Sequence, residues 1–156
     1  LDETLSLVEY QLRLQNIVCK RDYAEDLWPI MGDAGQLKQA ILNLILNAQD
    51  AMPKGGTLTL STRNSRRREV VVRVTDTGVG IPKESFSHIF EPFYTTKKAG
   101  AGVGLGLSVV YGIVRDHKGV IKVDSVVGKG TSFTLRFAAY RPEEKDQPTG
   151  EKLAAA

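Results

Sequence analysis

The segment from Gln36 to Met52 places the strongest constraint on the fold of this 156-residue chain. Apolar residues recur in it every three or four positions, a spacing that predicts an amphipathic helix with one broad buried face. The polar arc that remains is narrow, and it is made of amides and one acid: Gln36, Gln39, Asn43, Asn47 and Asp50. The stripe alone also fits an arc that faces solvent. Asparagine is a poor helix former, however, and a buried unpaired amide costs about 1 to 3 kcal/mol, so a metal ion or a phosphate is the partner we expect.

The composition fits one globular domain, with 42% hydrophobic and 25% charged residues. A net charge of +3 gives little support to nucleic-acid binding, and the only basic run, Arg66 to Arg68, is interpreted as a solvated hairpin tip. The single cysteine, Cys19, lies in an apolar-rich run and is expected to be a buried strand thiol, so a disulfide framework is excluded. Neither a membrane-spanning run nor a secretory signal is visible. We therefore expect a cytoplasmic setting, for a fragment of a longer protein that could be membrane-anchored.

Hydrophobic periodicity and turn residues divide the rest of the chain into short elements. Helical spacing is expected at 2–14, at 83–90 and from 107 onwards. Alternation predicts strands at 17–23, 57–63, 69–75, 120–126 and 131–138, of which the second and third form a hairpin and the last two close the sheet. A short extended piece is expected at 27–31, where Pro29 confines it to an edge or a bend. The residues from 141 onwards are predicted to be a disordered tail, with 152–156 as a cloning scar.

An acid and two alternating glycines, Asp76, Gly78 and Gly80, follow directly after a predicted strand. This pattern indicates a bend with little side-chain bulk and with one carboxylate at its rim. A generic turn explains it nearly as well. Downstream, the aromatic cluster from Phe90 to Tyr94 is expected to belong to the core.

The stretch from Thr95 to Gly106 contains four glycines at alternate positions and leads straight into a predicted helix. So much glycine would ordinarily indicate a flexible linker. A glycine-rich loop that feeds a helix N-terminus also exposes free backbone N–H groups at the positive end of the helix dipole, which is an anion site. Lys97 and Lys98 just upstream favour the anion site, although neither G-x-x-x-x-G-K-[ST] nor the dinucleotide-binding G-x-G-x-x-G is present.

Four motifs therefore occur in a fixed order: Asn43 with Asn47, the Asp76–Gly80 run, the segment 86–93, and the glycine run from Gly102 to Leu107. Together they resemble the catalytic ATP-binding domain of two-component sensor histidine kinases of the GHKL superfamily. The segment 89–111 is especially similar to the nitrogen-regulation-type subgroup. The resemblance covers about residues 1–138 and implies a domain over 1–140, of which 1–15 could continue a helix of a missing dimerisation domain. The implied fold class is α+β, a two-layer α/β sandwich of Bergerat type, with a mixed sheet of about five strands, three main helices on one face and an ATP lid.

The same resemblance implies ATP and Mg²⁺ as ligands. Asn47 would coordinate Mg²⁺, Asn43 would line the same site, and Asp76 would accept a hydrogen bond from the adenine amino group. Gly80 would let the backbone approach the base, Thr131 would reach the base through water, and Lys97 in the lid would contact phosphate. The other implied nucleotide-binding positions lie beside these: Gly78, Ile81, Gly102, Val103, Gly104, Leu105, Gly106 and Leu107. We expect the lid, 95–103, to be mobile without nucleotide and ordered by the triphosphate.

The implied function is transfer of the γ-phosphate of ATP to a histidine on a separate dimerisation domain. ATPases of the superfamily, such as gyrase, place a glutamate one helical turn before the Mg²⁺ asparagine, whereas this chain has Asn43 there. An amide cannot take a proton at neutral pH, so hydrolysis should be slow. The implied partners are that dimerisation domain and, through the full-length protein, a response regulator, with no nucleic acid. The isolated domain is expected to be a monomer and the full-length protein a homodimer.

Neither histidine of the chain fits the phosphoacceptor pattern of the resembled kinases. His88 is expected to pack beside the aromatic cluster, and His117 to carry its charge at a helix C-terminus. Two departures from the family pattern, Gln39 in place of glutamate and Asp50 with Ala51 in place of a basic residue and an aromatic one, shift the expected phosphate contacts towards the lid. An anti-sigma-type serine kinase and an ATP-sensing module without transfer remain as alternatives.

Overall fold

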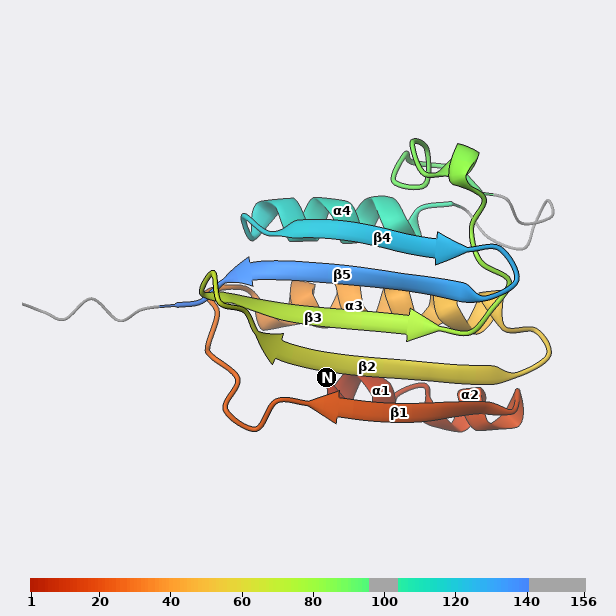
Figure 1. Ribbon diagram of the computed structural model, residues 1–156, viewed down its shortest axis with the longest axis horizontal. Helices are drawn as coiled ribbons and strands as arrows, with labels where there is room; N and C mark the ends of the chain where they lie inside the picture. Colours follow the sequence, from red (N-terminus) through yellow and green to blue (C-terminus); the bar gives the residue numbers. More distant parts are fainter. Residues whose placement is uncertain (96–103, 141–156) are drawn as a thin grey trace, which may run out of the picture.

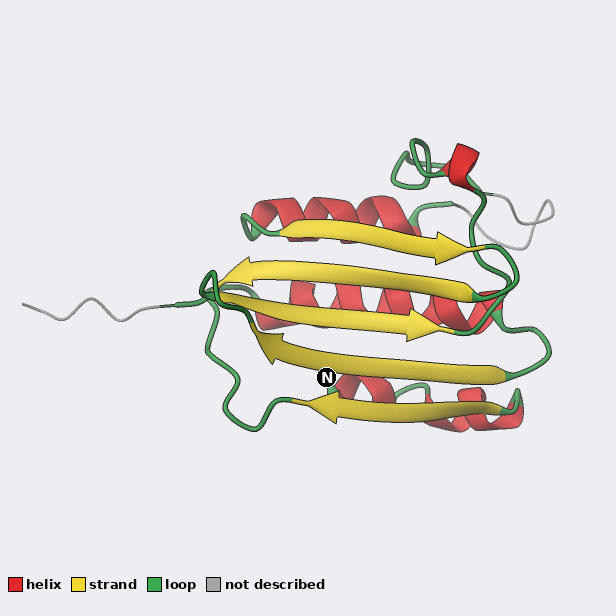
Figure 2. Cartoon of the chain, in the orientation of Figure 1, coloured by secondary structure: helices red, strands yellow, loops and turns green. Residues whose placement is uncertain are grey.

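A mixed five-stranded sheet with all of its long helices on one face forms the body of the molecule, as Figures 1 and 2 show. The computed structural model describes residues 1–95 and 104–140. Within them the elements follow in the order α1 (Asp2–Ser6), α2 (Glu9–Leu14), β1 (Ile17–Tyr23), α3 (Ala34–Ala51), β2 (Gly56–Asn64), β3 (Glu69–Asp76), the short 3-10 helix η1 (Lys83–Ser85), α4 (Gly106–Asp116), β4 (Val120–Val126) and β5 (Gly130–Ala138). None of the described helices is both long and apolar enough to cross a membrane.

The strand order is β1-β2-β3-β5-β4. β1 and β2 run parallel, and the other neighbouring pairs run antiparallel. The α+β prediction of a mixed sheet of about five strands is therefore confirmed. The expectation that the last two strands close the sheet is wrong, because β1 and β4 are its two edges and the sheet is open. The hairpin tip at 66–68 is exposed, as predicted.

Helix α3 forms where the sequence predicts it and packs along the middle of the sheet (Figure 1). Its N-terminus is capped by Asp33, whose side chain accepts a hydrogen bond of 2.8 Å from the backbone N–H of Gln36. The residues that it buries recur at helical spacing: Ala40, Ile41, Leu44, Ile45 and Ala48. Because this face is taken up by the core, the polar arc lies outside it, and two of its amides, Asn43 and Asn47, face Gly106 at the start of α4.

Several local predictions are wrong. The opening helix is two short helices, with a break at Leu7 and Val8, although the predicted buried residues Leu5, Val8 and Leu12 do reach the core. The piece at 27–31 contributes only an isolated bridge between Ile30 and Ala139. The segment 83–90 contains a single 3-10 turn rather than a helix.

The side-chain environments differ from expectation at two further places. Phe93 is 71% exposed, so the aromatic cluster is not wholly core, although Phe90 and Tyr94 do pack against the core. Cys19 is half-buried on β1, and burial raises the pKa of its thiol. The predicted tail lies outside the described residues.

Candidate nucleotide-binding site

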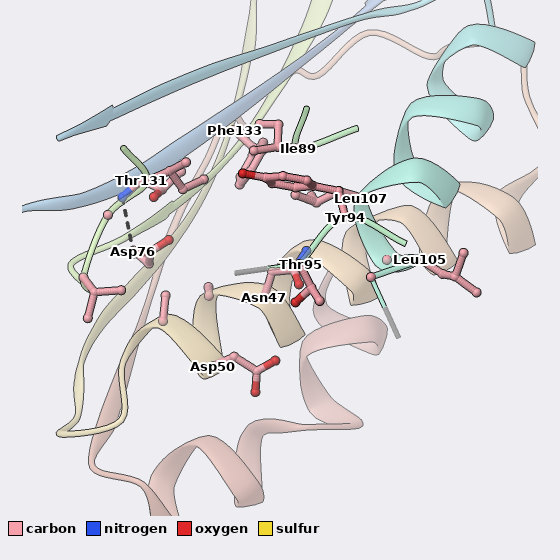
Figure 3. Close-up of a pocket in the computed structure, with 17 residues that line it drawn as sticks. Asn47, Asp50, Asp76, Ile89, Tyr94, Thr95, Leu105, Leu107, Thr131 and Phe133 are labelled. Carbon is pink, nitrogen blue, oxygen red and sulfur yellow. Dashed lines mark hydrogen bonds between the residues drawn. The ribbon is translucent and has the colours of Figure 1, made fainter. Parts of the chain in front are cut away.

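A cavity of about 350 Å³ opens between α3, the start of α4 and the ends of β3 and β5 (Figure 3). It brings together most of the residues that the sequence singled out, although they come from four separate parts of the chain. Those that line it are Asn47, Asp76, Gly80, Ile81, Gly104, Leu105, Gly106, Leu107 and Thr131. Lys97, Gly102 and Val103 lie outside the described residues, as does most of the predicted lid.

Asp76 is the buried acid of the cavity, with only 6% of its surface exposed. Its Oδ1 accepts hydrogen bonds from the backbone N–H of Gly78 at 2.8 Å and of Thr131 at 3.3 Å. Burial raises the pKa of this carboxyl above its ordinary value, and the two backbone hydrogen bonds act in the opposite direction. Because both bonds end on Oδ1, the carboxylate is fixed in orientation and Oδ2 is the oxygen left to receive a donor from a ligand.

Asn47 lies on α3 at the opposite side of the cavity and faces the start of α4 (Figure 3). Its Nδ2 is fully buried and has no hydrogen-bond partner among the described residues. A Cβ placed on Gly106 would stand 3.7 Å from Nδ2 and 3.8 Å from Oδ1 of Asn47. The absence of a side chain at Gly106 therefore keeps a space open beside an amide whose hydrogen-bonding capacity is unused, as a ligand site requires.

Two predicted site residues do not line the cavity and support it instead. Asn43, one turn before Asn47, donates from its Nδ2 to the backbone carbonyl of Gly106 at 3.4 Å. Gly78 orients Asp76 through its N–H, and a Cβ at this position would lie 2.4 Å from the carbonyl oxygen of Ala51. Asn43 thus joins α3 to α4, and the absence of a side chain at Gly78 allows the turn after β3 to lie against the end of α3.

Gly80 lines the cavity, but the reason for a glycine at this position is its close approach to the backbone of Val126. It has a φ of +75°, and a Cβ would come within 2.3 Å of the carbonyl oxygen of Val126. The next residue, Ile81, donates its backbone N–H to Oγ of Ser125 at 2.8 Å. The same Ser125 Oγ pairs with the hydroxyl of Thr131 at 2.9 Å. The turn after β3 is thereby tied to the β4–β5 hairpin, which sets the base of the cavity.

The N-terminus of α4 opens directly onto the cavity. Gly104, Leu105, Gly106 and Leu107 all line it, and Leu105, which precedes the helix, makes no side-chain capping hydrogen bond. Free backbone N–H groups at the positive end of the helix dipole remain available there. This is the geometry that the sequence predicts for an anion.

Sequence reasoning missed several lining residues, because nothing in a single sequence marks them. Ile89, Phe133 and Tyr94 form the apolar wall, and Thr95 closes the rim next to Tyr94. Asp50, which the polar arc did include, is exposed and also lines the cavity. The cavity therefore has an apolar wall between a buried carboxylate and a polar end, a combination typical of small-molecule sites.

The two histidines lie away from the cavity lining. His88 packs on Tyr94, with ring centroids 5.7 Å apart, so the prediction of its position beside the aromatic cluster is confirmed. His117 does follow the last residue of α4, but the expectation of a charged ring is wrong. Its Nε2 accepts the backbone N–H of Asp33 at 2.9 Å, and Nδ1 lies 2.7 Å from the carbonyl oxygen of Ile113, which together require the neutral tautomer with the proton on Nδ1.

No group of three or more histidine, cysteine, aspartate or glutamate side chains that could hold a metal occurs in the described part of the chain. A divalent cation at this site would take much of its coordination from phosphate oxygens and water, as Mg²⁺ commonly does.

Comparison with known proteins identifies an ATPase family. A profile of the family described as histidine kinase-, DNA gyrase B-, and HSP90-like ATPase matches residues 32–141. Sensor kinase CckA of Brucella abortus is 44% identical over 97% of this chain, and sporulation kinase A of Bacillus subtilis is 44% identical over 86%. The chain spans only 18% and 22% of the length of these two relatives.

Solved structures share the fold of this chain. The catalytic domain of histidine kinase ThkA superposes with a TM-score of 0.78 and 31% identity, over 88% of this chain and 89% of that one. Full-length ShkA in complex with AMPPNP superposes with a TM-score of 0.79 and 26% identity, over 90% of this chain and 30% of that one. By sequence and by structure, the chain belongs to the family of histidine kinase-, DNA gyrase B- and HSP90-like ATPases.

Proposed function

We propose that this chain is the catalytic domain of a sensor histidine kinase, which binds Mg-ATP and presents the γ-phosphate to a histidine on a separate dimerisation domain. The observation that carries the proposal is the placement of a buried carboxylate, Asp76, and an unpartnered buried amide, Asn47, in one cavity. The carboxylate suits the base end of a nucleoside triphosphate, and the amide suits its phosphate end. The apolar wall between them suits a base and a ribose.

Asp76 is the group proposed to recognise the base. Its Oδ1 is occupied by Gly78 and Thr131, so Oδ2 would accept the amino group of adenine. Guanine carries a carbonyl at that position, and two acceptors would then face each other in a buried site. We expect this mismatch to cost about 2 to 3 kcal/mol.

Asn47 and the N-terminus of α4 are proposed to hold the phosphates. The amide oxygen of Asn47 is a hard neutral ligand that fits Mg²⁺, and the space beside Gly106 leaves it accessible. Mg²⁺, when bound, would neutralise phosphate charge. The backbone N–H groups at the start of α4 would bind the phosphate oxygens directly. Lys97, Gly102 and Val103 are proposed to complete the phosphate contacts.

Transfer is favoured over hydrolysis because an amide, Asn43, and not a carboxylate stands one helical turn before Asn47. Asn43, one turn away, donates its amide to Gly106 and cannot take a proton from water at neutral pH. The domain would then act by aligning the γ-phosphate and excluding water while an external nucleophile attacks.

The external partners follow from the relatives, several of which are named sensor or sporulation kinases. ThkA has been solved in complex with a response regulator, TrrA, and superposes on this chain with a TM-score of 0.75 and 28% identity. We propose that the full-length protein forms a homodimer through a dimerisation domain, phosphorylates a response regulator and belongs to the nitrogen-regulation type.

The decisive experiment mixes this domain with γ-labelled radioactive ATP and a histidine-bearing dimerisation domain. Label that is lost in acid and retained in base identifies phosphohistidine and supports the proposal. Acid-stable label would instead identify a serine kinase, and tight ATP binding without label a sensor. A competition titration provides the second test: GTP should bind at least tenfold more weakly than ATP, as expected from a cost of about 2 kcal/mol, and equal affinities would contradict the role of Asp76.

A further inference from the structure

Tyr94 both lines the cavity and makes a side-chain hydrogen bond to a buried residue. It lines the cavity, where its ring lies between Leu107 on the α4 side and Phe133 on the sheet side (Figure 3). Its hydroxyl donates a hydrogen bond of 2.9 Å to Oγ of Ser85, a residue that is only 5% exposed. The ring thus faces the nucleotide site while its polar end is held inside the protein.

Ser85 is a fixed anchor for that hydroxyl. It ends η1, and its backbone N–H donates to the carbonyl oxygen of Pro82 at 3.0 Å. Its own carbonyl oxygen accepts the backbone N–H groups of His88 at 2.9 Å and Ile89 at 3.0 Å. Ile89 is 5% exposed and lines the same cavity. Ser85 therefore belongs to the rigid base of the cavity wall.

A backbone hydrogen bond of 2.9 Å, from the N–H of Phe93 to the carbonyl oxygen of Gly104, holds the main chain beside Tyr94. Phe93 directly before it has a φ of +66°, and its side chain is 71% exposed. The N–H of Tyr94 reaches the carbonyl oxygen of Glu91 only at 3.3 Å, and the imidazole of His88 packs on its ring from the solvent side of the cluster. These contacts hold the backbone, whereas the hydrogen bond from the hydroxyl to Ser85 is the polar contact that orients the ring itself.

We infer that Tyr94 is a positioning residue for ATP, whose hydroxyl acts on the nucleotide only through Ser85. The inference rests on the proposed function. The bond to Ser85 keeps the ring against the wall, so the cavity is open before the nucleotide arrives. Without this hydrogen bond the ring of Tyr94 is free to turn into the cavity. ATP can then bind only after the ring has moved back against the wall, which lowers the affinity. The effect falls on ATP affinity and not on phosphoryl transfer, because the hydroxyl is bonded away from the phosphate end.

The test is a double-mutant cycle made of Tyr94→Phe, Ser85→Ala and the two combined. Isothermal titration with a non-hydrolysable ATP analogue and Mg²⁺ gives the dissociation constants. Each single variant removes the same hydrogen bond, so each should bind roughly 3- to 10-fold more weakly than the wild type, and the double variant should bind no more weakly than the worse single one. In autophosphorylation with a dimerisation domain, KM for ATP should rise by the same factor while kcat stays unchanged.

Tyr111→Phe is the matched control. Tyr111 lies on α4 outside the cavity lining, stacks on Phe90 with ring centroids 5.4 Å apart and is 40% exposed. Loss of its hydroxyl should leave the dissociation constant unchanged. Dissociation constants equal to wild type in Tyr94→Phe, effects that multiply in the double variant, or a fall in kcat at constant KM would each overturn the inference. A wild-type protein that fails to bind the ATP analogue would instead refute the proposed function, so the two failures are distinguishable.

Discussion

The side-chain amide of Asn43 donates a hydrogen bond to the backbone carbonyl of Gly106 across 3.4 Å. This contact joins α3 to the first residue of α4, the two elements that we propose to hold the phosphates. Asn47, one turn further along α3, faces the same glycine. Contacts within the protein therefore bring α3 and α4 together at the proposed phosphate end of the site. A substitution at Gly106 should alter the surroundings of both asparagines.

Gly106→Ala should stabilise the fold and weaken ATP binding. Gly106 is the first residue of α4 and does not have a positive φ, so alanine there should restrict the unfolded chain without strain; this is worth roughly 0.4 to 1 kcal/mol and should raise the melting temperature. The added methyl group would stand in ordinary van der Waals contact with the Asn47 amide, at 3.7 Å, in the space where we propose that the metal and the phosphates bind. The measurements are thermal unfolding without nucleotide and titration with Mg-ATP.

Gly112→Ala provides the control for this prediction. Gly112 lies within the same helix, and a Cβ there meets nothing within 4 Å. It should give a comparable rise in melting temperature with no change in affinity. If Gly106→Ala binds ATP as tightly as Gly112→Ala does, the phosphates do not lie beside Asn47.

Asp76→Asn should raise the free energy of unfolding at neutral pH and lower the affinity for ATP. Burial raises the pKa of the Asp76 carboxyl, so the folded state holds its proton more tightly than the unfolded chain does. The carboxyl's contribution to stability is then present below its unfolded-state pKa and is lost as the pH rises through the higher folded-state value. At neutral pH the wild type bears the cost of a buried charge that asparagine lacks, while the oxygen of asparagine can still accept from Gly78 and Thr131.

The variant should consequently have a higher free energy of unfolding than the wild type at pH 7.5, and the difference should shrink as the pH falls towards the ordinary carboxyl value of 3.8. Urea unfolding at several pH values measures this. ATP affinity should fall roughly 30-fold or more, as for a loss of about 2 kcal/mol. A difference in stability that grows on acidification would show that hydrogen bonding to the charged form dominates over burial.

Gly80→Ala should destabilise the protein far more than Gly128→Ala. Both glycines have positive φ values, +75° and +79°, so both substitutions carry a similar backbone strain of about 1 to 2 kcal/mol. Only at Gly80 does the new Cβ meet backbone, 2.3 Å from the carbonyl oxygen of Val126, whereas at Gly128 nothing lies within 4 Å. The clash should add roughly 1 to 3 kcal/mol. Equal midpoints in urea unfolding would contradict the close approach of the two loops.

Local sequence patterns were sufficient to predict α3, α4 and all five strands. The spacing of apolar residues is imposed by burial on one face, and α3 and the β2–β3 hairpin keep that spacing without interruption. The local patterns also marked the acid at the end of β3 and the glycines before α4, but they left a generic turn and a flexible linker open, and only the resemblance to histidine kinases joined them into one expected site. Local pattern and tertiary position agree at these points.

Contacts between distant residues could not be predicted in the same way. The partner of Asn43 is a backbone carbonyl 63 residues away, and a carbonyl has no sequence signature. The aromatic cluster could not be divided by composition into a wall residue, Tyr94, and an exposed one, Phe93. The break at Leu7 and Val8 was invisible because both short helices preserve one apolar period.

His117→Phe should lower the free energy of unfolding by about 1 to 3 kcal/mol, because it leaves the backbone N–H of Asp33 facing a carbon atom. The N–H of Asp33 lies at the N-terminus of α3. Nδ1 of His117 reaches the carbonyl oxygen of Ile113 in α4, so the imidazole connects the two helices at the ends that lie away from the cavity. His88→Phe is the control: its side chain is 50% exposed, pairs with Glu91 at 2.9 Å and packs on the ring of Tyr94, a packing contact that phenylalanine can keep, so the substitution should change stability by no more than about 0.5 kcal/mol. Urea unfolding of the two variants checks the prediction. Similar midpoints for His117→Phe and the wild type would mean that the bond to Asp33 contributes nothing to holding α3 against α4.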